Sequence, residues 1–299
     1  MEDSLEWIAK EQGQWSATAG AMKHTYYGIR WLTFGTSIAG ALLAALASQA
    51  PRDDWRLWLA TVGAVVLALG GLLTARFLGP ERAARWARAR IASEALKRAA
   101  YEFAARAAPF DDHTTSKAKL EEQVNAIEKE VDDLLHDVVR AMPGSTPRRP
   151  WEPADYVSGR VEKSAAWYED AADENHRAAL SLRRIEILLA VATTALTATI
   201  GSVSKEWLNS HTAGFDWAAL VAVLTTVSST VLAHIEASRY DYLASSYRAA
   251  ARQLRLLVLS KPQQALAPST EWSQFVSRCE GVIASETGSW VARFGKAAQ

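Results

Sequence analysis

The chain has 299 residues, and its 33 lysines and arginines are balanced by 33 aspartates and glutamates, so its formal net charge is zero. This balance gives no electrostatic reason to expect nucleic-acid binding, which usually leaves a basic excess. The single cysteine, Cys279, excludes an intrachain disulfide and a structural cysteine-based metal site.

Four stretches without an acidic or basic residue are long enough to cross a bilayer, for which a helix needs about 20 apolar residues. They are residues 31–50, 57–75, 187–204 and 217–235. Core helices of soluble proteins rarely run this far without a charge on any face. The pattern therefore predicts an all-α integral membrane protein with four transmembrane helices and a cytoplasmic helical bundle.

The connectors between paired spans are short, at residues 51–56 and 205–216, so each pair is expected to form an antiparallel hairpin. Basic residues near the span ends indicate the orientation, because cytoplasmic flanks carry more lysine and arginine. Fourteen lie outside the hairpin loops: Lys23, Arg30, Arg76, Arg82, Arg85, Arg88, Arg90, Arg177, Arg183, Arg184, Arg239, Arg248, Arg252 and Arg255. Only Arg52, Arg56 and Lys205 lie within the loops. Both termini are thus predicted to be cytoplasmic.

The polar remainder predicts further helices, because it is rich in Ala, Glu, Arg, Leu and Lys. They are expected at residues 81–107, 115–142, 153–204, 217–260 and 270–294. A proline-rich linker at 143–153 divides the chain into two modules of the same layout, residues 1–142 and 154–299. Each module holds two spans, so the two repeats have the same orientation.

The interiors of the spans hold small and hydroxylated residues but no acidic or basic ones. In the first span Thr36, Gly40, Ala44 and Ser48 form one stripe, for which helix packing is the favoured interpretation. The third and fourth spans carry more hydroxyls, so packing and the lining of a water-filled pore both remain open. The candidate pore-lining residues are Thr193, Thr197, Ser204, Thr225, Thr226 and Ser229.

Glu186, Glu236 and His234 lie at the predicted cytoplasmic ends of the third and fourth spans. In an oligomer they would ring the mouth of a pore, and the two glutamates would favour cations there. Local pairing of the glutamates with Arg183, Arg184 or Arg239 is the favoured alternative.

Catalytic motifs are absent from the sequence, which has no H-E-x-x-H, phosphate-binding loop or G-x-S-x-G. Asp132, Asp133 and His136 could share a helix face as metal ligands, but so dense a run of charge favours a solvated or interhelical face. We therefore expect no enzyme, no cofactor and no metal.

The second half resembles the SLATT family of two-transmembrane effector modules through Tyr247-Arg248 and Leu254, and through the closing helix with Glu280, Glu286 and Trp290. The first half is similar through Arg85-Trp86 and Glu94-Ala-Leu-Lys97. The resemblance implies a tandem of two SLATT modules. Proteins of this family are found beside nucleotide-signalling and nucleotide-sensing proteins in bacterial defence loci.

By this resemblance, we expect a homo-oligomeric effector that permeabilises or depolarises the bacterial inner membrane. Its expected partners are the lipid bilayer, other copies of the chain and a nucleotide-sensing or nucleotide-producing protein. Two alternatives remain open: a regulated ion channel for ordinary homeostasis, and a membrane-anchored scaffold that does not conduct.

Overall fold

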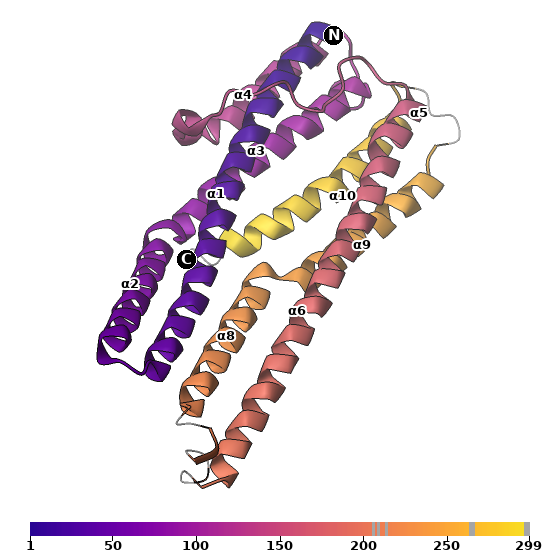
Figure 1. The fold of residues 1–299 in the computed structure, drawn as a ribbon. Helices are drawn as coiled ribbons and strands as arrows, with labels where there is room; N and C mark the ends of the chain where they lie inside the picture. The colour runs from indigo at the N-terminus through magenta and orange to yellow at the C-terminus, as the bar shows by residue number, and fades with distance from the viewer. Residues whose placement is uncertain (205–206, 208–209, 213–214, 263–266, 296–299) are drawn as a thin grey trace. The chain divides into compact units, whose positions relative to one another are not determined.

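The computed structural model describes residues 1–204, 207, 210–212, 215–262 and 267–295, with side chains described up to residue 285 of the last helix. The described residues are almost entirely helical and contain no strand, which confirms the all-α prediction (Figure 1). Within this described part of the chain, four helices are long and apolar enough to cross a membrane.

The helices of the first half are α1 (Glu2–Gln49), α2 (Asp53–Phe77), α3 (Pro80–Ala104), α4 (Ser116–Lys129) and the 3-10 helix η1 (Asp132–Asp137). Those of the second half are α5 (Pro153–Tyr156), the π-helical turn η2 (Val157–Glu162), α6 (Lys163–Ser202), α8 (Trp217–Ser238), α9 (Tyr240–Leu259) and α10 (Thr270–Gly295).

The four predicted spans lie in α1, α2, α6 and α8. As predicted for the third span, α6 completes a helix that begins at Pro153, with proline in its first turn. The first span likewise ends a longer helix, α1, which begins at Glu2. The loop predicted at 205–216 falls partly outside the described residues.

The helix predicted for residues 115–142 is wrong beyond Lys129, where α4 ends. The chain continues as η1 and then without regular structure, because its backbone finds partners on α1. The N–H of Val139 donates to Oγ1 of Thr18 at 2.9 Å, and the N–H of Gly144 donates to the carbonyl of Ala9 at 2.7 Å. These tertiary bonds replace the helical ones that a local pattern predicts.

The continuous helix predicted from 217 to 260 is also interrupted, at Arg239. This residue has a left-handed backbone with φ of 51°, and its N–H donates to the carbonyl of Ile235. That arrangement is a helix C-cap, so α8 ends there and α9 begins at Tyr240. Glycine or asparagine usually marks such a cap, and here neither is present to signal it.

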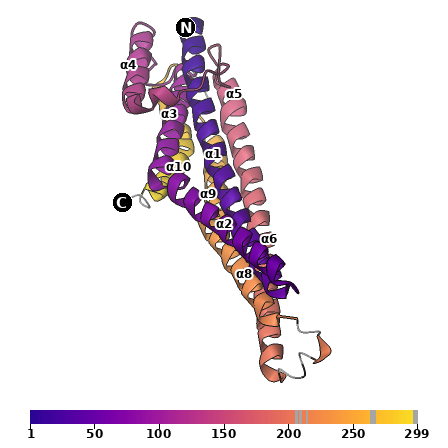
Figure 2. The ribbon, with the colours of Figure 1, turned by 60° about the vertical axis from the view of Figure 1, so that its left-hand side comes forward.

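The residues form two compact units, each drawing on both halves of the chain. We call Tyr27–Gly79 with Glu174–Leu243 the span unit, and Met1–Tyr26 with Pro80–Asp173 and Ala244–Gln299 the bundle unit. Within the span unit, α2 lies beside the second half of α1, and α8 lies beside the end of α6 (Figures 1 and 2).

Helices α5, η2 and α6 run on as one helix, Pro153–Ser202, which we call the α5–α6 rod. The core of the bundle unit joins α3, the start of this rod, α9 and α10. In this unit α10 lies along α3 (Figure 2). Trp272 of α10 is fully buried, and its Nε1 donates to the carbonyl of Ala105 at 2.8 Å. Around it pack apolar residues of several elements: Tyr156, Val161, Ala251, Leu254, Phe275, Val276 and Cys279.

The first part of α1 is buried in the same unit. Leu5, Ile8 and Trp15 are covered, and Nε2 of Gln12 donates to Oγ of Ser93 on α3 at 3.2 Å. The start of α1 thus belongs to the packed bundle, whereas its end belongs to the span unit.

Candidate functional site

Small residues hold the first hairpin of the span unit together. A Cβ atom added at Gly40 on α1 would lie 2.4 Å from Cγ of Leu67 on α2, and one added at Gly70 would lie 2.5 Å from Oγ1 of Thr36. Such an approach requires glycine. The stripe that contains Thr36 and Gly40 is therefore a packing surface between α1 and α2, as its favoured interpretation predicts.

Polar contacts at two points fix α1 against α8. Nη2 of Arg30 donates to the carbonyl of His234 at 3.1 Å and to Oγ of Ser238 at 2.8 Å. At the other point, Gln49 and Asp216 exchange two hydrogen bonds of 2.9 Å between the glutamine amide and the aspartate backbone. Since the start of one helix segment meets the end of the other at both points, α1 and α8 pack antiparallel.

His234 lies among aromatic rings in this contact. Its side chain is buried, with its ring centroid 4.8 Å from that of Trp31 and 5.5 Å from that of Phe34. Within one chain these α1 rings surround the imidazole, so the placement gives no direct support to a role at a pore mouth. That role stays a prediction.

Glu186 and Glu236, the other candidate mouth residues, form no ion pair within the described part of the chain, so local pairing with arginine is not observed. Arg183 instead donates from Nη2 to Oδ2 of Asp241 at 2.7 Å. This bond raises the pKa of Arg183, and the nearby glutamates add smaller electrostatic contributions in the same direction. The two glutamates remain candidates for a charged ring in an assembly.

The candidate hydroxyls on α6 and α8 all donate to carbonyls of their own helix. The pairs are Thr193 with Leu189, Thr197 with Thr193, Thr225 with Val221, Thr226 with Ala222, and Ser229 with Thr226. Ser204 lies beyond the end of α6, and its Oγ accepts from the N–H of Trp207 at 3.3 Å. A hydroxyl bonded in this way tolerates lipid, a neighbouring helix or water.

A groove of about 370 Å³ places Ser229 opposite hydroxyls of α1. It is lined by Arg30, Thr33 and Ser37 on α1 and by Ser229, Thr230 and His234 on α8. Thr33 and Ser37 were not among the predicted site residues. They lie four positions apart on one helix face, and that spacing could have revealed them.

The bundle unit contains a buried ion pair between Arg160 of η2 and Glu280 of α10. Nε of Arg160 donates to Oε1 of Glu280 at 2.9 Å, and Nη2 donates to Oε2 at 2.7 Å. The hydroxyl of Tyr156 donates to Oε1 at 3.0 Å, and the guanidinium carbon lies 4.1 Å from the ring centroid of Tyr101. Residues of four elements, α3, α5, η2 and α10, thus meet at this pair.

This environment perturbs several ionisations. Burial alone lowers the pKa of Arg160, but the carboxylate of Glu280 outweighs it and the pKa is raised. Burial and the same carboxylate raise the pKa of Tyr156 well above its ordinary value. Burial, with a smaller contribution from Glu280, raises the pKa of Cys279 to about 12. All three groups keep their protons at neutral pH.

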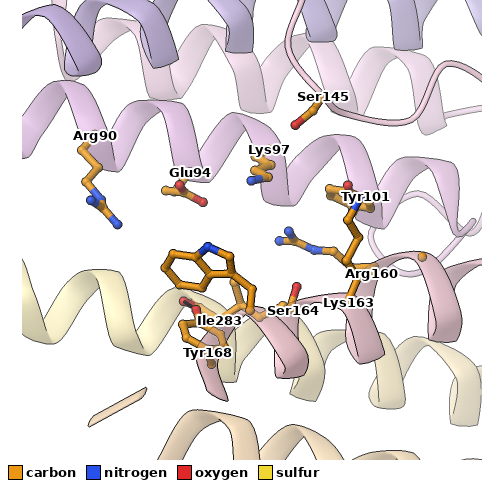
Figure 3. A pocket seen from close by; sticks show the side chains of 12 residues that line it. Arg90, Glu94, Lys97, Tyr101, Ser145, Arg160, Lys163, Ser164, Tyr168 and Ile283 are labelled. Atoms are coloured by element: carbon orange, nitrogen blue, oxygen red, sulfur yellow. Dashed lines mark hydrogen bonds between the residues drawn. The ribbon is translucent and has the colours of Figure 1, made fainter. Parts of the chain in front are cut away.

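A pocket of about 310 Å³ opens beside the ion pair (Figure 3). Arg90, Glu94, Lys97 and Tyr101 of α3 line one side, while Lys163 and other residues from the start of the α5–α6 rod line another. Burial lowers the pKa of Lys97. Besides Arg160, the described lining carries three cationic side chains, Arg90, Lys97 and Lys163, and one carboxylate, that of Glu94.

Several of the residues that carry the family resemblance lie in or near this region. Arg248 pairs with Asp173 at 3.1 Å, and the ring of Tyr247 packs against those of Trp167 and Tyr168. Glu280 is the acid of the buried pair. The side chains of Glu286 and Trp290 lie outside the described residues.

Arg160 and Tyr156 were missed by sequence reasoning. They lie four residues apart after Pro153, a spacing that places them on one helix face. The available signal was that Arg160 shares a helix face with apolar core positions. Its partner Glu280 could not be identified, because it lies 120 residues away on α10.

The segment with Asp132, Asp133 and His136, which was considered for metal binding, contacts arginines of α3. Arg88 pairs with Asp133 and Arg85 with Asp137, and His136 lies 2.9 Å from Nη2 of Arg85. Among the described residues, no group of three His, Cys, Asp or Glu side chains is placed to hold a metal ion. This segment therefore joins η1 to α3.

Two apolar helical hairpins and a polar helical unit define the class of this molecule: it is an all-α membrane protein. Residues 156–290 match the family described as SMODS and SLOG-associating 2TM effector domain 1. The second half of the chain thus matches the SLATT family, which confirms the resemblance for that half. Residues 13–118 match a second family, described as protein of unknown function (DUF4231), as a tandem of two related modules predicts. No curated protein and no solved structure matches the chain.

Proposed function

We propose that this protein is a membrane effector of a bacterial defence system that assembles from several copies into a pore. The match of residues 156–290 to a two-transmembrane effector domain carries the proposal. The match supports an activity at the membrane. Under the proposal, the effector acts there by changing permeability. Under this proposal the protein resides in the inner membrane.

The exposure of the spans supports assembly. No residue in the most apolar window of α6 is buried within the chain, and only 22% of the window in α8 is buried. Exposed hydroxyls such as Thr197 and Ser229 stand on these helices beside exposed apolar residues. Lipid suits the apolar faces, whereas neighbouring copies or a water-filled path suit the hydroxyls.

Leakage from vesicles tests pore formation. Purified protein is reconstituted into vesicles of phosphatidylethanolamine and phosphatidylglycerol that contain potassium and a small dye. We expect faster potassium release than from protein-free vesicles and from vesicles with a heat-inactivated sample. Native mass measurement in mild detergents accompanies it, and multiples of the 32.7 kDa chain are expected. A monomer that releases nothing would contradict the proposal.

The second candidate function is a membrane-anchored scaffold without a pore. The observation in its favour is that the candidate hydroxyls of α6 and α8 already donate within their helices, so that no water is required. An oligomer that releases neither potassium nor dye, and that causes no toxicity on overexpression, would support the scaffold instead.

The proposed topology has both termini in the cytoplasm, as the distribution of lysine and arginine indicates. A reporter enzyme fused after Gln299 is expected to behave as cytoplasmic. Periplasmic activity of that fusion would contradict this orientation without bearing on conductance.

A further inference from the structure

The pocket in the bundle unit is built from one face of α3 and one face of the start of the α5–α6 rod. Arg90, Glu94, Lys97 and Tyr101 follow one another at helical spacing, so they stand in a row along α3 (Figure 3). Both walls belong to helices within one compact unit. The pocket is therefore a fixed feature of the packed bundle.

The charge of this pocket favours an anion. Arg160 is neutralised by Glu280, and among the other described side chains that line the pocket Lys97 and Lys163 face the carboxylate of Glu94. Lys97 is the more informative of the two, because its side chain is only partly exposed and makes no hydrogen bond or ion pair with the described residues. Partial desolvation of an ammonium without an acceptor is costly, and an anionic ligand in the pocket would supply one.

An aromatic surface adjoins the charges. Trp167 lines the pocket and is 54% exposed, although it belongs to the polar bundle unit and not to a span. Its ring is held edge-on by Tyr168, at a centroid distance of 5.1 Å, and by Tyr247, at 5.6 Å. An indole held in place with more than half its surface uncovered is suited to stack on a flat ring.

The size of the pocket restricts the ligand. Its volume of about 310 Å³ is at the lower end for small-molecule sites. The space suits one compact molecule, with a charged group and one ring system, better than a polymer or a chain of several such units.

We propose that this pocket binds a small aromatic phosphate of mononucleotide size, with its phosphate held by Lys97 and the neighbouring cations and its ring against Trp167. A phosphate matches the excess of positive charge, and a flat ring matches the exposed indole. This site is separate from the spans, so the proposal holds whether or not the chain conducts.

Isothermal titration of the full chain in detergent, in a buffer free of phosphate, tests the site. The probes are AMP, GMP, CMP and UMP, with ribose 5-phosphate as a phosphate without a base and adenosine as a base without a phosphate. We expect saturable binding of at least one mononucleotide at one site per chain. Ribose 5-phosphate is expected to bind more weakly, and adenosine least.

Substitutions assign the binding to the pocket. Lys97→Gln is expected to weaken mononucleotide binding about tenfold or more, since a charge-assisted bond to phosphate is lost, whereas Lys97→Arg retains it. Trp167→Leu is expected to reduce the affinity to that of ribose 5-phosphate. Lys129→Gln, at an exposed position on α4, is the matched control and is expected to bind as the unmodified chain does.

Thermal unfolding of each variant shows whether its fold is retained, and Lys97→Gln removes an unpaired charge without removing a contact. Absence of saturable binding by all four mononucleotides would overturn the proposal. So would equal affinities of the Lys97→Gln and Lys129→Gln chains. Binding of adenosine as tight as that of AMP would overturn the role of the phosphate.

Discussion

Arg160 and Glu280 form a two-pronged ion pair in the core of the bundle unit, with side chains that are only 6% and 1% exposed. The pair joins the π-helical turn η2 to α10, across 120 residues of sequence. Both prongs and the hydroxyl of Tyr156 use the carboxylate, so the removal of either charge leaves the other buried without its partner.

Glu280→Gln is accordingly expected to lower the free energy of unfolding by about 3–5 kcal/mol, because a buried guanidinium loses its counter-charge. Denaturant unfolding in detergent measures it. Glu271→Gln, at an exposed position in the first turn of the same helix, is the control and is expected to change stability by less than about 0.5 kcal/mol. Equal stabilities of the two variants would show that the pair contributes little.

Gly13 is expected to be essential for the packing of the irregular segment on α1. A Cβ atom there would lie 2.4 Å from the carbonyl oxygen of Met142 and 2.6 Å from the nitrogen of Gly144. Gly13→Ala should therefore lower the free energy of unfolding by about 1–3 kcal/mol, since backbone atoms must move. Gly20→Ala on the same helix meets nothing within 4 Å and should stabilise by about 0.5–1 kcal/mol. Stabilisation by both changes would contradict this packing.

Cys279 is expected to resist alkylation in the folded protein. It is fully buried, and burial raises the pKa of its thiol to about 12, so the reactive thiolate is scarce near pH 8. Iodoacetamide labelling followed by mass spectrometry measures the rate, which should rise sharply once the protein is denatured. In the control chain Ser158→Cys, the exposed new thiol should react quickly without denaturant. Fast labelling of native Cys279 would contradict the burial.

The membrane-spanning helices could be predicted from the sequence because the signal is local. A run of about 20 residues without charge has one physical outcome in a bilayer, and the helices α1, α2, α6 and α8 follow it. The start of α5 could be predicted for a similar reason, because the fixed φ of Pro153 suits the first turn of a helix.

The features that the sequence did not reveal depend on distant partners. The irregular segment that follows η1 is held by a hydroxyl and a carbonyl of α1, more than a hundred residues earlier. The end of α8 at Arg239 could not be predicted, because this left-handed cap has arginine where glycine is usual. The pocket was missed because α3 and the start of the α5–α6 rod each read as an ordinary charged helix, and only their packing brings Lys97 and Lys163 to one cavity.

Lys97 should give the stability of the chain a measurable pH dependence. Burial lowers its pKa in the folded state below the ordinary 10.5, so the charged lysine destabilises the fold. This cost is complete below the lowered pKa and disappears as the pH rises towards 10.5. Lys97→Gln should therefore unfold at a higher temperature than the unmodified chain near neutral pH, with a difference that shrinks in alkaline buffer. A difference that grows with pH would contradict this assignment.

Thr226 and Ser229 are predicted to line a pore, and Ser229 also lines the groove that holds hydroxyls of α1. Thr226→Leu and Ser229→Leu should reduce conductance in planar bilayers severalfold, because a bulkier apolar wall is harder to wet.

In a Cys279→Ser background, Thr226→Cys and Ser229→Cys should react with small water-soluble thiol reagents while the pore conducts. Val227→Cys, at a partly exposed position about 160° from Ser229 around α8, is the control on the opposite face and should not react. Native mass measurement shows whether assembly survives each change. If the protein conducts while both introduced thiols stay unreactive, α8 does not line the pore, and the threonines of α6 become the next candidates.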